Sequence, residues 1–531
     1  MRFHRMTALA AAGALTLGLL AACSSGKQPG SAASGDQQAS QSSSGSTSGA
    51  TGSGSASDAG SGAGSASASA GSGSSGSASA SASTSGSGST SGSASAASGP
   101  IVPSGKVTIT VAGLLPTADD AAKKQLAERV ASFEKQYPNI TVTPVDYNWT
   151  NATFTTQLAG GTLPNVFEIP LTDGKTLIQQ HQLADIDRYV KALPYGSQFN
   201  PALIGNGTDQ DGKIYAVPAK SIYAVALHYN RKLFTQAGLD PDKPPTTWDQ
   251  VRQDAKIIHD KTGIAGYGMM ALDASGGWQL AAAANSRGGV IETSDGNGKY
   301  TATLTDPAVK ASLQFLKDLR WQDDSLLPRA DLGWGEINAA FGGGEVAMYT
   351  SGSDVYTALV QSNGVDANWG YGLTAIPTEN GGGALTGGTL AAVTKNSTDD
   401  QKAAAVLWID WWYLSKLQDK DQAIADAKTL ADANPPQAVG TPVLPIFSQQ
   451  VYEESQSWIK QYINAPLEDM TGYTDVMFSQ KLVPEAAVAT QDLYNALFPV
   501  VQAVITDKNA DIDKLLAAAN KTGQAAIDAA G

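Results

Sequence analysis

The chain has 531 residues, a formal net charge of −14 at pH 7 and a single cysteine, Cys23. The acidic balance argues against nucleic acid as a partner, because such binding needs a basic surface. One cysteine allows no intramolecular disulfide, and the four histidines lack the spacing of a metal site, so neither a metal nor another cofactor is predicted.

The first 22 residues have the pattern of a secretory signal. Arg2 and Arg5 precede an apolar run that is shorter than the roughly 20 residues of a comfortable membrane span. The run ends in Leu20-Ala21-Ala22-Cys23, which resembles the lipobox of bacterial lipoproteins. The resemblance implies cleavage before Cys23, acylation of its thiol and anchoring to the outer face of the cell membrane. The alternatives are an ordinary signal peptide and a buried free cysteine.

Residues 23–104 consist almost entirely of Ser, Gly and Ala. Such a segment has too little apolar surface to offset the entropy of ordering it. We interpret it as a flexible tether with a root-mean-square span of roughly 50 Å. The predicted folded part is therefore 105–531, which is long enough for two lobes with separate cores.

The folded part begins with alternating strand and helix patterns. Period-two apolar spacing predicts strands at 106–113, 140–145 and 165–169, and helical spacing predicts helices at 119–137 and 153–159. This alternation favours parallel strand pairing in an open, doubly wound α/β sheet.

Ligands of such sheets bind beyond the carboxyl ends of the strands. Trp149 follows the second strand, and Glu168 and Asp173 lie at and after the end of the third, so all three are candidate ligand-binding residues. A core-capping aromatic is the alternative for Trp149. Glu168 needs a partner because a buried carboxylate is costly, and that partner is either a protein donor or a ligand hydroxyl.

Several loose motifs follow in a fixed order along the middle of the chain. They are Asp211–Pro218, read as a turn and a strand; Leu227–Phe234; Pro244–Trp248, with Thr247 as a helix N-cap; Phe341–Met348; and a Gly-Gly pair before the strand 390–394. Their order resembles family 1 extracellular solute-binding proteins of ABC importers, across essentially all of residues 106–531.

The resemblance implies a two-lobed α/β fold, periplasmic-binding-protein-like, of the type II or maltodextrin-binding-protein kind with a hinge. It places one lobe at about 106–222 and 346–395, and the other at about 223–345 and 396–531. A ligand would enter the cleft, the lobes would close over it, and a membrane permease would receive it. A monomeric binding protein without catalytic activity is implied.

Relatives of this kind mostly bind sugars, which present an apolar face and many hydroxyls to aromatic and carboxylate groups. Five further residues are candidates for such contacts: Tyr223, Trp278, Trp334, Ser351 and Gly388. Glycines beside Trp278 and Trp334 allow close backbone approach. A plain turn is the alternative for the Gly387-Gly388 pair, and helix capping is the alternative for the Thr350–Ser353 segment.

We therefore expect a lipid-anchored component of an ABC importer that captures a carbohydrate, in particular an oligosaccharide. A binding protein for another solute, such as a phosphorylated polyol, a polyamine or a chelate, is the main alternative. A surface glycoside hydrolase would need two carboxylates about 5–10 Å apart, which the sequence does not place. A lectin-like adhesin is the third alternative.

Overall fold

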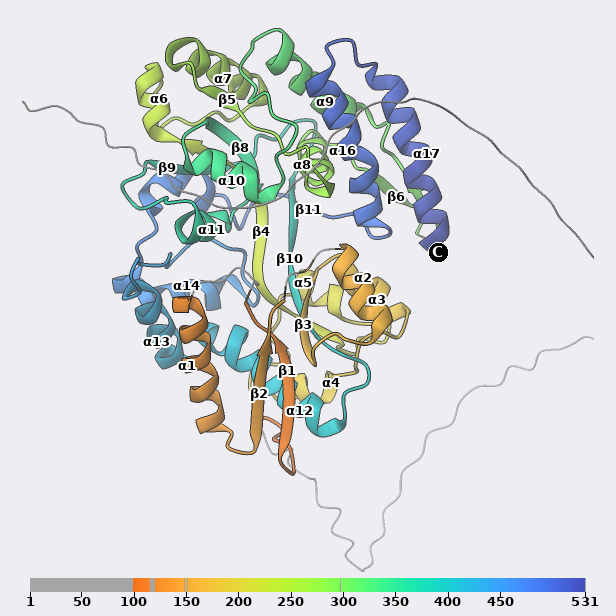
Figure 1. The fold of residues 1–531 in the computed structure, drawn as a ribbon, viewed down its shortest axis with the longest axis vertical. Coiled ribbons are helices and arrows are strands. Elements are labelled where there is room, and N and C mark those ends of the chain that lie inside the picture. Colours follow the sequence, from red (N-terminus) through yellow and green to blue (C-terminus); the bar gives the residue numbers. More distant parts are fainter. Residues whose placement is uncertain (1–98, 115–119, 148, 150, 297, 531) are drawn as a thin grey trace, which may run out of the picture. The chain divides into compact units, whose positions relative to one another are not determined.

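A computed structural model describes residues 99–114, 120–147, 149, 151–296 and 298–530 (Figure 1). Cys23, the predicted signal and most of the predicted tether lie outside these residues. Within the described part, no helix is both long and apolar enough to cross a bilayer. The structure therefore bears on the predicted folded region.

Nine of the described strands form one mixed sheet in the order β2-β1-β3-β10-β4-β8-β5, with β11 beside β10 and β9 beside β4. The parallel pairing of β1 with β2 and β3 confirms the prediction from the alternating pattern. The strands are β1 (Val107–Ala112), β2 (Ile140–Val145), β3 (Val166–Pro170), β4 (Ala216–Asn230), β5 (Ala265–Tyr267), β8 (Val346–Gly352), β9 (Tyr371–Ala375), β10 (Ala384–Val393) and β11 (Leu482–Pro484). A separate hairpin joins β6 (Glu292–Ser294) to β7 (Tyr300–Ala302).

Helices cover both sides of the sheet (Figure 1). The early ones are α1 (Asp120–Gln136), α2 (Asn151–Gly160), α3 (Asp173–Gln179), α4 (Asp187–Lys191), α5 (Pro201–Ile204), α6 (Arg231–Ala237), α7 (Trp248–Thr262), α8 (Ala274–Ser286) and α9 (Pro307–Trp321). The later ones are α10 (Trp334–Gly342), α11 (Val355–Ser362), α12 (Asp399–Ile409), α13 (Lys420–Ala431), α14 (Gln449–Ile459), α15 (Thr471–Thr474), α16 (Thr490–Thr506) and α17 (Ile512–Ala530). Thr247 caps α7 as predicted, in a reciprocal box with Gln250.

The long strand β4 crosses from one set of partners to another. Residues 216–224 pair with β10, residues 225–229 pair with β8, and residues 226–230 pair with β9 on the other side. Gly387 and Gly388, predicted as a loop before a strand, lie inside β10 instead. The pairing of β10 with β4 shifts register just after Gly387. Gly387 faces Tyr223 directly, and the absence of a Cβ allows the close approach of the Tyr223 ring.

The helix α12 packs beside the early strands. It contacts β1, and the buried Trp408 meets Phe133 of α1 edge-on with ring centroids 5.2 Å apart. Residues 399–409 therefore belong with the strands of the predicted first lobe, whereas the sequence-based boundaries put all of 396–531 in the second. The remaining boundaries stay a prediction.

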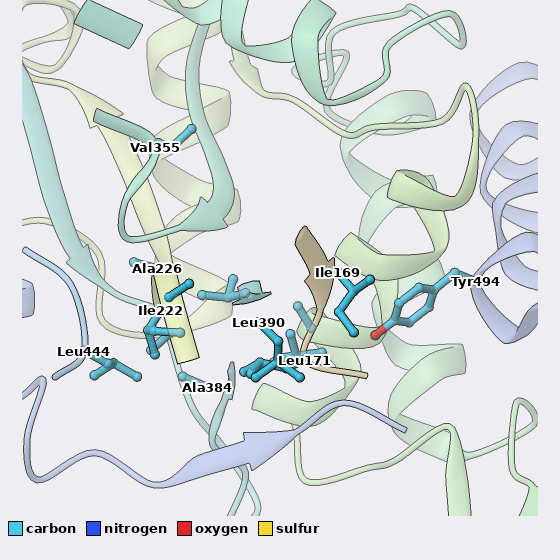
Figure 2. Packing of buried hydrophobic residues seen from close by; sticks show 14 of the residues in the cluster. Ile169, Leu171, Ile222, Ala226, Val355, Ala384, Leu390, Leu444 and Tyr494 are labelled. Atoms are coloured by element: carbon cyan, nitrogen blue, oxygen red, sulfur yellow. The ribbon is translucent and has the colours of Figure 1, made fainter. Parts of the chain in front are cut away.

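One apolar core runs along the sheet. Figure 2 shows part of it, with Leu171 after β3, Ile222 in β4 and Leu390 in β10. All three side chains are buried, as is Leu444 from a later segment. The apolar residues of the crossing region thus come from parts of the chain up to 273 residues apart, counted from Leu171 to Leu444.

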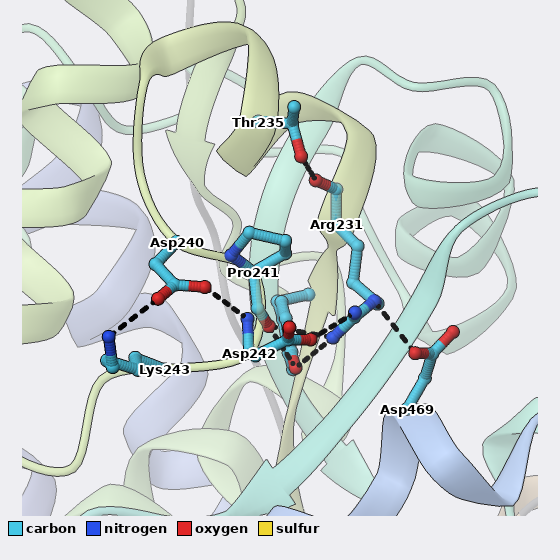
Figure 3. A network of polar contacts seen from close by, with 8 residues as sticks. Arg231, Thr235, Asp240, Pro241, Asp242, Lys243 and Asp469 are labelled. Atoms are coloured by element: carbon cyan, nitrogen blue, oxygen red, sulfur yellow. Dashed lines mark hydrogen bonds and ion pairs between the residues drawn. The ribbon is translucent and has the colours of Figure 1, made fainter.

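A polar cluster fastens the far end of β4 to the late part of the chain (Figure 3). Arg231 lies immediately after β4; its guanidinium donates to the carbonyl of Pro241 at 2.7 Å and pairs with Asp242 at 2.5 Å. Its Nε also pairs with Asp469 at 3.0 Å. Because Arg231 is largely buried, this network fixes the segment around Asp469 against β4 more firmly than a surface pair would.

Gly277 in α8 offers a test of the packing between α8 and α16. A Cβ at this position would lie 2.1 Å from the carbonyl oxygen of Tyr494 in α16. We expect Gly277→Ala to lower the free energy of unfolding by at least about 1–3 kcal/mol, because the two helices must move apart. Gly335→Ala, where a Cβ meets nothing within 4 Å, is the control and should be neutral or stabilising by about 0.5–1 kcal/mol. Equal urea midpoints for the two variants would contradict this close contact between α8 and α16.

Candidate ligand-binding site

Tyr223 lies where β4 changes partners, and other aromatic and acidic side chains gather around it. Its ring meets Trp278 of α8 edge-on, with centroids 6.0 Å apart and planes at 85°. Burial raises the pKa of the Tyr223 hydroxyl well above its usual range, and the nearby carboxylates of Glu485 and Asp354 raise it further. The phenol is therefore neutral and keeps its proton for hydrogen bonding.

Two glycines make room for this ring. A Cβ on Gly387 would lie 2.4 Å from the Tyr223 hydroxyl, and one on Gly352 would lie 2.9 Å from its Cγ. Gly352 ends β8 and Gly387 lies in β10, so both strands that flank β4 have a glycine at the point of contact. Gly388 contributes only backbone atoms, and its carbonyl accepts a hydrogen bond from the Leu171 amide at 2.9 Å.

Glu485 brings a carboxylate to the cluster from just after β11. The hydroxyl of Tyr494 donates to it at 2.9 Å, and burial raises the pKa of Glu485 to about 7. The negative charge of Asp173, at the start of α3, raises it further. We call Tyr223, Trp278, Gly387, Glu485 and Tyr494 the crossing site.

Asp173 supplies a second acid, and its surroundings are equally poor in positive charge. Burial raises its pKa to about 6, and the Thr172 hydroxyl donates to it at 3.3 Å. Among the residues that the structure describes, neither Asp173 nor Glu485 forms an ion pair with Lys or Arg. Each carboxylate therefore keeps acceptor capacity for hydroxyl groups of a ligand.

A cavity of about 1130 Å³ opens beside Glu485. Thr172, Thr386 and Glu485 are part of its wall, together with Lys175 of α3 and Lys299. The volume is sufficient for more than a monosaccharide, since pockets for drug-sized ligands measure roughly 300–1,000 Å³.

The structure places the other predicted residues apart from this cluster. Glu168 accepts from the Tyr413 hydroxyl at 2.5 Å and pairs with Lys220 at 2.8 Å, so protein donors satisfy it. Trp149 is half-buried with its ring centroid 6.5 Å from that of Phe154. Its Nε1 has no hydrogen-bond partner among the described residues.

Trp334 and Ser351 differ strongly in exposure. Trp334 begins α10 and is 48% exposed. Ser351 is fully buried in β8, and its hydroxyl has no partner within the described part of the chain. The structure thus unites Tyr223, Trp278 and Gly388 at the crossing, with Asp173 linked through Glu485.

Sequence reasoning missed Glu485 and Tyr494. They lie more than 260 residues beyond Tyr223, and the only local signal is an acid followed shortly by the aromatic-rich start of α16. Nothing in their spacing predicts that the chain returns to the crossing of β4 and β10.

Comparison with known proteins identifies the family. The model of the bacterial extracellular solute-binding protein family matches residues 128–431, which is more than half of the chain. The chain belongs to this family. The predicted membership of the solute-binding proteins of ABC transporters is confirmed, and membership identifies a binding protein rather than an enzyme.

Curated relatives include the sn-glycerol-3-phosphate-binding periplasmic proteins UgpB of Pectobacterium atrosepticum and Brucella melitensis. The first is 26% identical over 266 residues, covering 48% of this chain and 56% of the relative. The second is 28% identical over 231 residues, covering 42% and 51%. These matches span about half the length of the relatives.

Solved structures match over a larger share of the chain. A Thermotoga lettingae ABC transporter solute-binding protein bound to α-D-tagatose has a TM-score of 0.63 at 18% identity, covering 79% of this chain and 99% of that one. Maltose-bound MalE3 of T. maritima has a TM-score of 0.61 at 21% identity, covering 78% and 98%. The predicted periplasmic-binding-protein fold of the maltose-binding kind is confirmed.

The raised pKa values make a prediction about pH. The folded state holds protons on Glu485 and Asp173 that the unfolded chain releases, so their contribution to stability is present at low pH and is lost as pH rises through about 6 to 7. We expect Glu485→Gln to raise the free energy of unfolding at pH 8 relative to wild type and to flatten its decline between about pH 4.5 and 7. Urea unfolding across this range measures it.

Glu454→Gln on the exposed face of α14 is the control for the loss of one negative charge. It should leave the slope of stability against pH unchanged. Parallel profiles for wild type and Glu485→Gln would show that Glu485 does not titrate with a raised pKa.

Proposed function

We propose that this protein captures a neutral carbohydrate, in particular an oligosaccharide, at the crossing site and delivers it to the permease of an ABC importer. The observation that carries the proposal is the grouping of Tyr223, Trp278 and Tyr494 with two carboxylates that lack cationic partners in the described structure. Aromatic rings suit the apolar face of a sugar, and carboxylates accept its hydroxyl hydrogens.

A phosphorylated polyol is the second candidate. The curated relatives bind sn-glycerol 3-phosphate, and Lys175 and Lys299 line the cavity beside the crossing site. A phosphate at the crossing itself would face Glu485 and Asp173, and like charges repel strongly where water is scarce. The acids therefore favour a neutral ligand.

The delivery step rests on hinge closure and on the lipid anchor. β4 and β10 connect the two sets of strands, and rotation about such connections is the usual closing motion of this fold. Acylation of Cys23 would hold the protein at the membrane, and the Ser/Gly/Ala tether would keep it within reach of its permease.

Binding is tested by calorimetry with maltose, maltotriose, tagatose and sn-glycerol 3-phosphate. We expect sugar binding that is stronger at pH 7.5 than at pH 5, because hydroxyl donors stabilise the ionised forms of Glu485 and Asp173. Binding of glycerol 3-phosphate without binding of any sugar would replace the first candidate by the second.

Trp334 and Trp149 lie apart from the crossing site, so they test whether a bound oligosaccharide extends beyond it to further aromatic side chains. Trp334→Ala should weaken sugar binding by about 1–3 kcal/mol with little loss of stability, because the side chain is half exposed and a lost aromatic contact has this magnitude. Trp149→Ala should weaken binding similarly. Ile257→Ala, at another exposed apolar residue in α7, is the control. Wild-type affinity in both variants would remove these residues from the site.

The anchor is tested in cells. Cys23→Ser should move the protein from the detergent-extracted membrane fraction to the medium or soluble fraction, because a lipid chain is the only membrane attachment proposed. Fractionation with immunoblotting measures the change, and mass spectrometry of the mature N-terminus detects the acyl chains. An unchanged distribution, or a wild-type protein without lipid, would contradict the assignment.

A further inference from the structure

A second cavity borders the same crossing strand. It measures about 340 Å³, and Lys220, Ser221 and Ile222 of β4 form part of its wall. Its described lining shares no residue with the crossing site. Tyr223, the next residue along β4, packs instead against Trp278. We call this second space the hinge cavity.

Backbone hydrogen bonds hold the wall of the hinge cavity in place. The amide of Leu444 donates to the carbonyl of Ile222 at 2.8 Å, and the amide of Asn200 donates to the carbonyl of Ile446 at 2.9 Å. Leu444 and Ile446 both line the cavity, and both are buried. The segment between α13 and α14 is thus fastened to β4 and to the early part of the chain, and the cavity is a built feature of the fold.

The charged residues of the lining all have one sign. Arg129, Lys220 and Lys416 line the hinge cavity, and the described lining contains no Asp or Glu. Carboxylates lie behind them: Glu168 pairs with Lys220 at 2.8 Å, and Asp426 pairs with Arg129 at 2.5 Å and with Lys416 at 3.3 Å. These carboxylates do not line the cavity, and neither does Asp354, which also interacts electrostatically with Lys220. The charge that the described lining presents to a ligand is therefore positive, which favours an anion.

The rest of the lining is aromatic and apolar. Trp412 stacks with Trp408 at 5.4 Å with planes at 12°, and the Arg129 guanidinium lies over its ring, 4.7 Å from the ring centre. Phe447 and Tyr452 add two more rings to the wall. Because these contacts already fix the Trp412 ring, the ring loses little conformational freedom when a ligand packs against it. The three aromatic side chains of the wall suit a flat apolar group.

We propose that the hinge cavity is a second ligand site, for a small aromatic carboxylate. The carboxylate would face Lys416 and Lys220, and the ring would pack among Trp412, Phe447 and Tyr452. The volume of about 340 Å³ lies at the small end of the range for ligand pockets, as such a compact molecule requires. The proposal does not depend on the identity of the ligand at the crossing site.

Titration of the full chain with phenylacetate and with neutral phenylacetamide, followed by calorimetry, tests the site. We expect phenylacetate to bind and phenylacetamide to bind at least tenfold more weakly, since the amide lacks the charge that the lysines recognise. Lys416→Gln should weaken phenylacetate at least fivefold. Lys420→Gln, an equal change of charge at an exposed position that begins α13, should leave it unchanged.

Two further variants locate the binding. Val451→Trp narrows the cavity from α14 and should abolish phenylacetate binding, whereas Trp278→Ala at the crossing site should leave it intact. Circular dichroism melting confirms that each variant is folded. No heat up to about 10 mM phenylacetate, equal binding of the amide, or loss of binding in Trp278→Ala but not in Lys416→Gln would each overturn the proposal.

Discussion

The structure depends on the double pairing of β4. A strand of 15 residues must satisfy its backbone groups along its whole length, and it does so by exchanging β10 for β8 and β9 half-way. The exchange point is where side chains of both sets of strands meet. Tyr223 lies at that point, so the requirement for backbone pairing also determines where the candidate site forms.

The exchange leaves irregular backbone that the surrounding residues must support. Ser221 has a φ of 49°, which is costly for a residue with a Cβ, and its side chain hydrogen-bonds the half-buried Asp354. In β10, the register of pairing with β4 shifts between Gly387 and Leu390. Hinges are formed by a few residues that absorb changes in φ and ψ, and Ser221, Gly387 and Gly388 are irregular positions on two adjacent strands.

The carboxylates near the crossing divide into two kinds. Glu168 has a lysine and a tyrosine hydroxyl as partners, so its charge stabilises the protein itself. Glu485 accepts from the Tyr494 hydroxyl at 2.9 Å and Asp173 from the Thr172 hydroxyl at 3.3 Å, and neither has a cationic partner in the described part of the chain. Their raised pKa values reflect burial with few donors. A ligand with several hydroxyls supplies what the protein does not.

Much of the fold could be predicted from the sequence because local patterns decide it. The alternation of residues 107–111 predicts β1, and Thr247 as an N-cap predicts the start of α7. The partners of a residue at the end of a strand are harder to predict. Glu168 and Asp173 are both near the end of β3, yet Glu168 pairs with a lysine and Asp173 does not. Glu485 could not be found at all, since only tertiary packing brings it to Tyr223.

The sequence relatives and the similar solved structures bind different ligands, so neither comparison alone identifies the ligand of this protein. Identity of 26% over about half of a relative's length does not decide the ligand, because proteins that share a fold can differ in the site grafted on it. Similarity of fold at 18–21% identity reflects constraints on the sheet. The ligand depends instead on a few side chains that these constraints leave free. At the crossing those side chains are Trp278, Glu485 and Tyr494. A carboxylate there without a cationic partner among the described residues favours a neutral ligand over an anion.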